Sequence, residues 1–548
     1  MAIGSDIIAK AMKNEGVSDF FYIMGAPMMA VEKAAMKLGL RGIDVRHEQA
    51  AAMAGFAYAR LLNKPAFCMA ASGPAVTNLV TGIAHAWADC TPVIALGGAA
   101  PVVTWHHGAF QDIDQLSMFK PCTKWADRVH HTKRIPELIN LAVKHAMSGK
   151  PGPVYLDMPG DILYAEVDES KIEYPDPYDH AKRPRPAVGA NDLSAIADLL
   201  AKAKQPVLIT GSGVQWSEAE KEMLAFVEAA GVPFYTTPQG RGVIPEDHKY
   251  CYLTSRAAAF RDADLILVVG TRMNYIIGHA APPRWNANAK IVRVDIDPIE
   301  IASSPRNLAV GVIADARTAF QQLTAAISGK VTPATYETWR ERLRTRNVQK
   351  TAEAEQTLSN PATPIHPLRL CKEVRDFMDR DCVLCVDGQE ILNYGRQAIP
   401  QYTARHRINS GAFGTMGVGM PFGIGAKVAC PDKQVIVLHG DGSFGMNAME
   451  FDTAVRHGLP ILTIISQNGG WTGDPNKEKP GRDLGYPRLD KFAEAFGGHG
   501  EWVDKPDDIR PALERAMKAV KAGKPALVCV VTDGNARATT TAFTNYST

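Results

Sequence analysis

Short apolar segments alternate with helix-length amphipathic segments along the whole chain, and this alternation limits the fold more than any other feature. The apolar runs are continuous, which is typical of strands covered on both faces of a parallel sheet. We therefore predict an α/β protein with doubly wound parallel sheets, whose ligands bind beyond the carboxyl ends of the strands. The predicted strands are FFYIMG, IDVRHE, AFCMAA, PVIALGG and PVYLDMP, then PVLITGSG, PFYTTP, LILVVGTR and IVRVDID, and finally CVLCVDG, VIVLHGDG, ILTIISQN and ALVCVVTD.

Two linker-like stretches divide the 548 residues into three blocks. The first, near 172–190, is rich in proline and charge, and the second, from about 330 to 365, joins a charged helical piece to NPATPIHP. Each block has the usual size of a domain. We predict three doubly wound domains at residues 1–180, 190–330 and 360–548.

The composition excludes several classes of partner. Sixty Lys and Arg residues against 58 Asp and Glu residues give a net charge of +2, which provides no electrostatic surface for nucleic acid or for an acidic membrane. No apolar run reaches the ~18 residues of a membrane span, and the N-terminus lacks the pattern of a secretory signal. Nine scattered cysteines suit a reducing compartment. We expect a cytoplasmic protein that binds neither nucleic acid nor membrane.

Two predicted strands end in residues that suit a metal and a diphosphate. Gly440-Asp441-Gly442 follows VIVLHGDG, and Asn468 ends ILTIISQN. A carboxylate and an amide oxygen are ligands that Mg²⁺ shares with phosphate and water, and glycines let backbone N–H groups approach phosphate closely. A simple turn after a strand is the alternative for an isolated GDG, but the second polar strand end and the helix expected between the two favour a site.

The segment from HGDGSFGMNAMEFDTAVRHG to ISQNGGW resembles the thiamine-diphosphate motif of the decarboxylase and acetolactate-synthase superfamily. The resemblance implies thiamine diphosphate and Mg²⁺ as cofactors. It implies that Asp441, Asn468 and the carbonyl group of Gly470 are the metal ligands. Gly440, Gly442 and Ser443 would contact the cofactor beside them. The superfamily's usual pair of asparagines is Gln467-Asn468 here, and the changed residue precedes the expected ligand.

Two further segments match the superfamily's contacts to the pyrimidine ring. The sequence RHEQAA (residues 46–51), at the end of the predicted strand GIDVRHE, resembles the activating-glutamate motif. This resemblance makes Glu48 the expected group at the pyrimidine N1′. The apolar AAAMAGFAYAR that follows predicts a buried helix, in which a carboxylate needs a function; a solvated helix cap is the alternative. The loop at residues 409–417 resembles the pyrimidine-facing loop, so the Gly414 carbonyl and the Met416 N–H would hold the ring. A glycine-rich start of a helix with a core methionine is the alternative for this loop.

The resemblance names the three domains as pyrimidine-binding (1–180), middle (190–330) and diphosphate-binding (360–548). In this superfamily the activating glutamate and the metal motif come from different chains. We therefore expect self-association as a dimer or tetramer, with active sites at the interface.

Segments of the middle and third domains indicate the branch of the superfamily, because they resemble enzymes that act on acyl-CoA. Residues 236–285 resemble the middle domain of 2-hydroxyacyl-CoA lyases and oxalyl-CoA decarboxylases, with Arg272 and Asn274 in an Arg-x-Asn-aromatic signature. The sequence that holds FAD in biosynthetic acetolactate synthases is not seen, so FAD is not expected. Arg396, Arg405 and Arg407 also resemble positions of the acyl-CoA enzymes and could meet coenzyme A phosphates; surface arginines remain the alternative.

The pair Phe110-Gln111 indicates which reaction of the acyl-CoA branch to expect. Oxalyl-CoA decarboxylases carry a Tyr-Glu pair there and a tyrosine at the position of Thr472, whereas Phe-Gln is the pattern of the lyases and acetolactate synthases. We therefore expect a lyase or carboligase that cleaves or forms a 2-hydroxyacyl-CoA, with Gln111 bonded to a substrate oxygen. An oxalyl-CoA decarboxylase and a 2-keto-acid decarboxylase or acetolactate synthase are the alternatives.

The strand IVRVDID ends in Asp295, and an acid at this position can hold the hydroxyl groups of an adenosine. We expect ADP as a candidate ligand of the middle domain, with a helix cap as the alternative for these acids. The polar tail at 536–548 is similar to tails that close over the site in acyl-CoA relatives, although a frayed terminus suits the same composition.

Overall fold

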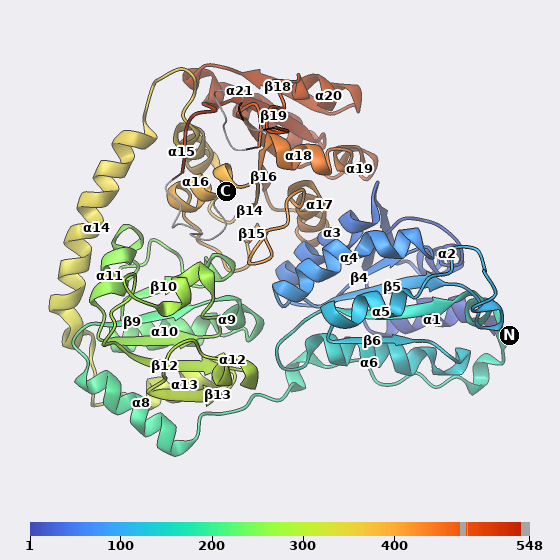
Figure 1. Cartoon of the computed structure of the whole chain (residues 1–548), viewed down its shortest axis with the longest axis horizontal. Coiled ribbons are helices and arrows are strands. Elements are labelled where there is room, and N and C mark those ends of the chain that lie inside the picture. The colour runs from blue at the N-terminus through green and yellow to red at the C-terminus, as the bar shows by residue number, and fades with distance from the viewer. Residues whose placement is uncertain (472–477, 479, 539–548) are drawn as a thin grey trace.

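The computed structural model describes all residues except 472–477, 479 and 539–548. Three parallel sheets, each packed against helices, follow one another along the chain (Figure 1). The predicted fold class, three doubly wound α/β domains, is confirmed. Among the described residues, no helix combines the length and the apolar character needed to cross a membrane.

The N-terminal sheet has the strand order β3-β2-β4-β5-β7-β6, and all neighbouring strands are parallel. Successive side chains enter two separate apolar clusters, Phe20 and Phe67 in one and Phe21 and Cys68 in the other. Both faces are therefore buried, which explains the continuous apolar runs. The elements are β2 (Asp19–Tyr22), β3 (Arg41–Asp44), β4 (Ala66–Ala70), β5 (Val93–Ala99), β6 (Trp125–Arg128), β7 (Val154–Pro159), α1 (Gly4–Asn14), α2 (Met29–Lys37), α3 (Glu48–Leu62), α4 (Pro74–Ala88), α5 (Gln115–Phe119), α6 (Ile135–Met147) and α7 (Gly160–Tyr164), with a small antiparallel pair of β1 (Ala2–Ile3) and β8 (Glu166–Val167).

The middle sheet has the strand order β10-β9-β11-β12-β13. Its strands and the helices packed on them share an apolar core of their own. A long helix, α14 (Glu337–Leu358), leaves this domain along the outside of the molecule and leads to the third sheet (Figure 1). It lies in the predicted second linker and packs through Trp339 and Leu343. The other elements are β9 (Pro206–Thr210), β10 (Phe234–Thr236), β11 (Leu265–Val269), β12 (Lys290–Asp295), β13 (Val310–Ile313), α8 (Ala190–Lys202), α9 (Ser212–Trp216), α10 (Glu220–Ala230), α11 (Arg256–Asp262), α12 (Pro298–Ala302) and α13 (Ala316–Ala326).

The C-terminal sheet has the order β15-β14-β16-β17-β19-β18, again parallel throughout. The helix that we predicted between the two polar strand ends is in fact two short helices, α18 and α19, because the chain leaves helical geometry at Asn447. The elements are β14 (Val383–Asp387), β15 (Arg407–Asn409), β16 (Val435–Gly440), β17 (Leu462–Gln467), β18 (His499–Val503), β19 (Ala526–Val531), α15 (Pro367–Phe377), α16 (Glu390–Ala398), α17 (Gly419–Ala429), α18 (Asp441–Met446), α19 (Glu450–Arg456), α20 (Leu489–Ala495) and α21 (Ile509–Lys521).

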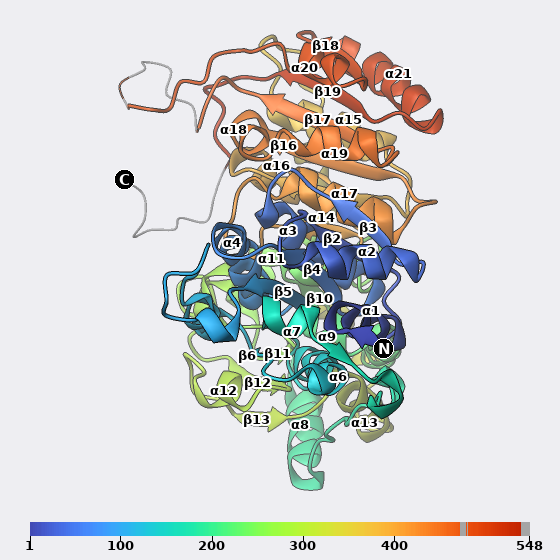
Figure 2. The ribbon, with the colours of Figure 1, turned by 90° about the vertical axis from the view of Figure 1, so that its right-hand side faces the viewer.

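Helix α3 of the first domain packs against α17 of the third, and Figure 2 shows the two domains stacked at this contact. A Cβ at Gly425 would lie 2.0 Å from the carbonyl oxygen of Ala54, so glycine here lets the two helices touch through their backbones. The small residues of α3 thus form one apolar core with the third domain, and they fix the activating-glutamate motif relative to the metal motif.

Candidate active site

The carboxyl ends of β16 and β17, two neighbouring strands, bring Asp441 and Asn468 together. The Asp441 carboxylate accepts hydrogen bonds from the backbone N–H groups of Gly442 and Gly469, each at 2.8 Å. The end of the Asn468 side chain lies 3.1 Å from Oδ1 of Asp441 and 2.9 Å from the carbonyl oxygen of Gly470. The three residues predicted to be metal ligands therefore converge on one point.

The chemistry of this group fits a divalent cation. A carboxylate, an amide and a backbone carbonyl offer the hard oxygen ligands that Mg²⁺ prefers. With its nitrogen inward, the Asn468 amide donates to Asp441 and Gly470; with its oxygen inward, it completes a set of three oxygens that a cation would stabilise. Burial raises the pKa of Asp441 to about 6, an effect that a bound cation would oppose. In the part of the chain that the structure describes, no cluster of three or more His, Cys, Asp or Glu side chains offers another metal site.

A strap at residues 482–486 fixes the loop that carries Gly470. Gly470 pairs with Asp483 in an isolated antiparallel bridge, and the N–H of Trp471 donates to the carbonyl oxygen of Arg482 at 3.0 Å. A Cβ at Gly470 would lie 2.0 Å from that same carbonyl oxygen. The absence of a side chain therefore lets the strap approach and set the direction of the Gly470 carbonyl.

Glu48 lies in the first turn of α3, half-buried, directly after the capping residue His47. Its Oε2 accepts a hydrogen bond from the side-chain amide of Asn78, on α4, at 2.8 Å. The helix that follows is buried along most of its length, as predicted. The carboxylate thus lies at the start of an apolar helix, and the Asn78 amide orients it.

Asn447 joins the helix of Glu48 to the loop at residues 409–417. Its Oδ1 accepts a hydrogen bond from Nε2 of Gln49 at 3.0 Å, and its Nδ2 donates to the carbonyl oxygen of Gly417 at 2.6 Å. Because Asn447 directly follows α18, one buried side chain connects three segments of the candidate site. No sequence motif singled it out, and its burial as a polar residue is visible only in the structure.

The loop at residues 409–417 has left-handed backbone conformations at three of its glycines. Gly411, Gly414 and Gly417 have φ values of 54°, 72° and 82°, in the region that favours glycine. Gly414 is exposed and Met416 is half-buried. Both residues predicted to hold the pyrimidine are therefore accessible from solvent in the single chain.

A buried pair, Asp387 and His439, supports the start of α17, the helix after this loop. Asp387 accepts hydrogen bonds from the N–H groups of Gly419 at 2.9 Å and Gly388 at 2.7 Å, and burial raises its pKa to about 7. Nδ1 of His439 lies 3.6 Å from the Asp387 carboxylate, and a Cβ at Gly419 would lie 2.2 Å from the ring. Burial lowers the pKa of His439 to about 3, so the ring is neutral. Sequence reasoning missed both residues.

The segment at residues 102–113 places Gln111 beside Ser72. The Ser72 hydroxyl donates to Oε1 of Gln111 at 2.7 Å, which leaves the amide nitrogen as the group that can donate to a ligand. Gln111 has a φ of 57°, and a Cβ at Gly73 would lie 2.6 Å from its carbonyl oxygen. Phe110 is 85% exposed. The two residues that we predicted as a catalytic pair therefore have different surroundings in the single chain.

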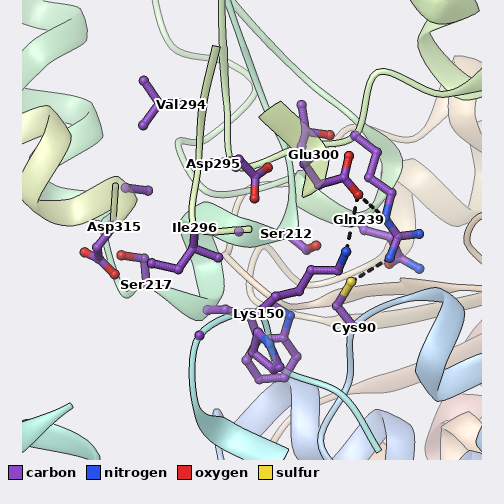
Figure 3. Close-up of a pocket in the computed structure, with 18 of the residues that line it drawn as sticks. Cys90, Lys150, Ser212, Ser217, Gln239, Val294, Asp295, Ile296, Glu300 and Asp315 are labelled. Carbon is purple, nitrogen blue, oxygen red and sulfur yellow. Dashed lines mark hydrogen bonds and ion pairs between the residues drawn. The ribbon is translucent and has the colours of Figure 1, made fainter. Parts of the chain in front are cut away.

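A cavity of about 350 Å³ lies between the N-terminal and middle domains. In Figure 3, Asp295 lies at the end of β12, and Lys150 reaches in from the N-terminal domain. Burial raises the pKa of Asp295 to about 6. Lys150 Nζ pairs with Asp297 at 2.7 Å across the cavity wall. The cavity is also lined by Arg272 and Asn274.

Arg272 and the arginines that we expected near coenzyme A have different surroundings in the structure. Arg272 lies at the cavity wall, where Nη2 is 2.6 Å from the sulfur of Cys90. Arg405 pairs with Glu220 at 2.9 Å on the middle domain. Arg396 is half-buried on α16, and Arg407 is buried on β15.

Comparison with protein families matches one segment in each of the three domains, in order along the chain. Residues 3–118 match the model described as thiamine pyrophosphate enzyme, N-terminal TPP binding domain. Residues 193–323 match the thiamine pyrophosphate enzyme central domain, and residues 392–530 match the C-terminal TPP binding domain. The chain belongs to the thiamine pyrophosphate enzyme family.

Relatives of this thiamine pyrophosphate enzyme carry several activities in their names. A 2-hydroxyacyl-CoA lyase from Arabidopsis thaliana is 31% identical over 97% of this chain and 95% of its own. An oxalyl-CoA decarboxylase from Escherichia coli is also 31% identical, with the same coverage. A probable acetolactate synthase from Mycobacterium bovis is 30% identical over 96% of this chain and 95% of its own. The predicted superfamily and branch are thereby confirmed, and thiamine pyrophosphate is the thiamine diphosphate of our prediction.

Two sequence predictions for this thiamine pyrophosphate enzyme concern residues outside the described part of the chain. Thr472 falls in the first undescribed segment, and most of the polar tail at 536–548 falls in the last. Both stay predictions.

Proposed function

We propose that this thiamine pyrophosphate enzyme is a carbon–carbon lyase or carboligase that cleaves or forms 2-hydroxyacyl-CoA, with Mg²⁺ as its second cofactor. Cleavage would give formyl-CoA and an aldehyde or ketone. The similarity to 2-hydroxyacyl-CoA lyases and oxalyl-CoA decarboxylases supports a coenzyme A thioester as substrate. The Phe110-Gln111 pair favours cleavage or ligation over oxalyl decarboxylation.

The observation that carries the proposal is a group of arginines between the middle and C-terminal domains. Burial lowers the pKa of Arg396 to about 10, and the neighbouring Arg241 and Arg256 act in the same direction. Burial also lowers the pKa of Arg407 well below its usual range. Glu246 accepts a hydrogen bond from Nε of Arg241 at 2.7 Å. The group consists of Arg241, Arg256, Arg284, Arg396 and Arg407.

This arginine group has more positive charge than the protein neutralises. Within the described residues its ion pairs involve only Glu246, and Nε and Nη2 of the buried Arg407 have no hydrogen-bond partner there. Coenzyme A carries a diphosphate and a separate phosphate, and guanidinium groups bind phosphate in a bidentate way. An acyl-CoA would therefore supply the negative charge that the group lacks.

The chain's own residues have distinct tasks in this proposal. Bound thiamine diphosphate supplies the electron sink through which the carbon–carbon bond breaks. Glu48 would hold a proton at the pyrimidine N1′, and the Gly414 carbonyl would orient the amino group of the same ring. Asp441 and Asn468 would hold Mg²⁺ against the diphosphate, while Gln111 would donate a hydrogen bond to a substrate oxygen.

The proposal is tested by assaying purified protein with thiamine diphosphate and Mg²⁺ against a panel of 2-hydroxyacyl-CoA esters, with pyruvate in parallel. We expect formyl-CoA only when thiamine diphosphate is present. Arg396→Ala should raise KM for the esters about tenfold or more and change kcat less, because a phosphate contact acts in binding. Arg380→Ala is the control, since Arg380 is exposed and pairs with Asp247 at 2.8 Å. Turnover of pyruvate without any on the esters would contradict the proposal.

We also propose ADP, rather than FAD, as a ligand of the cavity at Asp295. The support is the position of this acid at the carboxyl end of a strand in a doubly wound sheet, at the wall of a cavity large enough for a ligand. Equilibrium dialysis with ADP and with FAD tests it. Absence of binding by either nucleotide would remove the proposal.

We propose that the chain self-associates as a dimer or tetramer across the candidate site. Large apolar side chains on segments of that site are exposed in the single chain, namely Phe110, Phe413 and Met446. Covering them would stabilise an oligomer. Sedimentation at several protein concentrations should show a dimer or tetramer, and Phe110→Asp should weaken it. A fully active monomer would contradict the proposal.

A further inference from the structure

Both backbone groups of Ala412, in the loop at residues 409–417, are held by other domains. The N–H of Ala412 donates to Oδ1 of Asp89 at 3.2 Å, just after α4 of the N-terminal domain. Its carbonyl oxygen accepts a hydrogen bond from the hydroxyl of Tyr275, in the middle domain, at 2.9 Å. Ala412 lies two residues before Gly414, so this double contact is next to the expected pyrimidine contacts.

The second oxygen of Asp89 extends the contact. Oδ2 accepts a hydrogen bond from Nε2 of Gln239 at 2.7 Å, and the same nitrogen lies 3.2 Å from the carbonyl oxygen of Asn409. A Cβ at Gly411 would lie 1.6 Å from Oδ2. The Asp89 side chain is 4% exposed. The carboxylate therefore fills a space that the loop leaves open only because residue 411 is glycine.

His85 adds an aromatic contact on the same side. Its Nε2 lies 3.3 Å from Oδ2 of Asp89, and its ring stacks against Phe413 with centroids 6.4 Å apart. His85 is completely buried and also packs on Phe56 and Phe422. The ring beside Asp89 is therefore fixed in a rigid wall.

We propose that Asp89 is a positioning residue for the pyrimidine end of thiamine diphosphate. A loop with three left-handed glycines has many conformations available, and ordering it on cofactor binding would cost affinity. By holding the Ala412 N–H and Gln239, Asp89 keeps the Gly414 carbonyl and Met416 in place before the cofactor arrives. The residue acts through the loop and not by touching the cofactor. The inference depends on cofactor use by the family and not on the acyl-CoA proposal.

Calorimetry on the full-length, cofactor-free protein tests this. Thiamine diphosphate and inorganic pyrophosphate are titrated separately, each with Mg²⁺, into the unchanged protein, Asp89→Asn and Asp89→Ala. Asparagine would turn an amide N–H toward the donating amide of Gln239, and alanine would release Ala412 altogether. We expect the Kd for thiamine diphosphate to rise at least about tenfold, and the Kd for pyrophosphate to stay within about twofold, because pyrophosphate uses only the Asp441 end of the site.

A reciprocal exchange provides the rescue. In Asp89→Asn/Gln239→Glu the asparagine amide can donate to the new carboxylate and its oxygen can still accept from Ala412, so the affinity for thiamine diphosphate should recover in large part. Asp157→Asn is the matched control. Asp157 is a buried carboxylate of the same domain, 2.6 Å from Arg128, and its loss should lower the thermal midpoint without changing the ratio of the two affinities.

Two results would overturn the proposal. One is an unchanged affinity for thiamine diphosphate in both Asp89 variants. The other is an equal loss of affinity for thiamine diphosphate and for pyrophosphate, which would mean that Asp89 only supports the fold. Neither titration uses a substrate, so failure of the acyl-CoA assay would not affect the outcome.

Discussion

The side-chain amide of Asn78 donates a hydrogen bond to Oε2 of Glu48 at 2.8 Å. This bond fixes the direction of the carboxylate at the start of α3. We predict that Asn78→Ala lowers kcat about tenfold, because the carboxylate loses the donor that orients it. Asn78→Asp should have a larger effect through like-charge repulsion. The measurement is kcat at saturating cofactor, and an unchanged kcat in both variants would contradict the prediction.

Glu48→Gln should remove most turnover, by about 100-fold or more, which is the usual size of a lost proton-transfer group. The amide keeps the shape of the side chain but cannot hold a proton for the pyrimidine ring. Binding of Mg²⁺ and diphosphate should persist, because that end of the site does not include Glu48. Single-turnover rates of cofactor-saturated protein are the measurement. Near-normal rates would refute the role given to Glu48.

Removal of the Asp441 carboxylate should weaken the binding of thiamine diphosphate that depends on Mg²⁺. We expect Asp441→Ala to weaken Mg²⁺-dependent binding of thiamine diphosphate by about tenfold or more, since the only charged ligand of the group is lost. EDTA should release cofactor from the unchanged protein, and added Mg²⁺ should restore binding. Calorimetry with and without Mg²⁺ measures both effects. Binding that is indifferent to EDTA and to the substitution would be evidence against a metal here.

Glu450 provides a test of stability against pH. It accepts hydrogen bonds from the N–H groups of Arg46 and His47, at 3.0 and 3.1 Å, across the contact between the first and third domains. Burial raises its pKa from 4.5 to about 7. A carboxyl group with a raised pKa in the folded state contributes stability that is complete below about pH 4.5 and is lost as the pH rises through 7. The loss is on the order of 3 kcal/mol.

Glu450→Gln should therefore flatten the decline of the thermal midpoint between about pH 5 and 8. The amide oxygen still accepts both backbone hydrogen bonds but never ionises. Glu353→Gln, on the exposed surface of α14, is the control and should leave the slope unchanged. If the variant at residue 450 keeps the full pH dependence, another group is responsible for it.

The strands that sequence reasoning found and those that it missed differ in position. Every interior strand of the three sheets was predicted from its continuous apolar run, and so were two edge strands, β3 and β10. The missed strands of the parallel sheets, β6, β13, β15 and β18, all lie at a sheet edge. An edge strand has one neighbour and is often partly exposed, as the burial of β13 and β18 shows. It therefore lacks the apolar run that marks a strand.

The sequence by itself determined the three doubly wound sheets and the meeting of Asp441 with Asn468. Parallel strands put their carboxyl ends at one edge, so two polar strand ends on neighbouring strands must lie close together. Only the tertiary structure decided which side chains support the site. Asp89 and Ala412 are 323 residues apart in the chain, and Gln49 and Asn447 are 398 apart. Contacts of this kind form when separate domains dock, and their geometry depends on the shapes of both surfaces, which no local pattern of residues records.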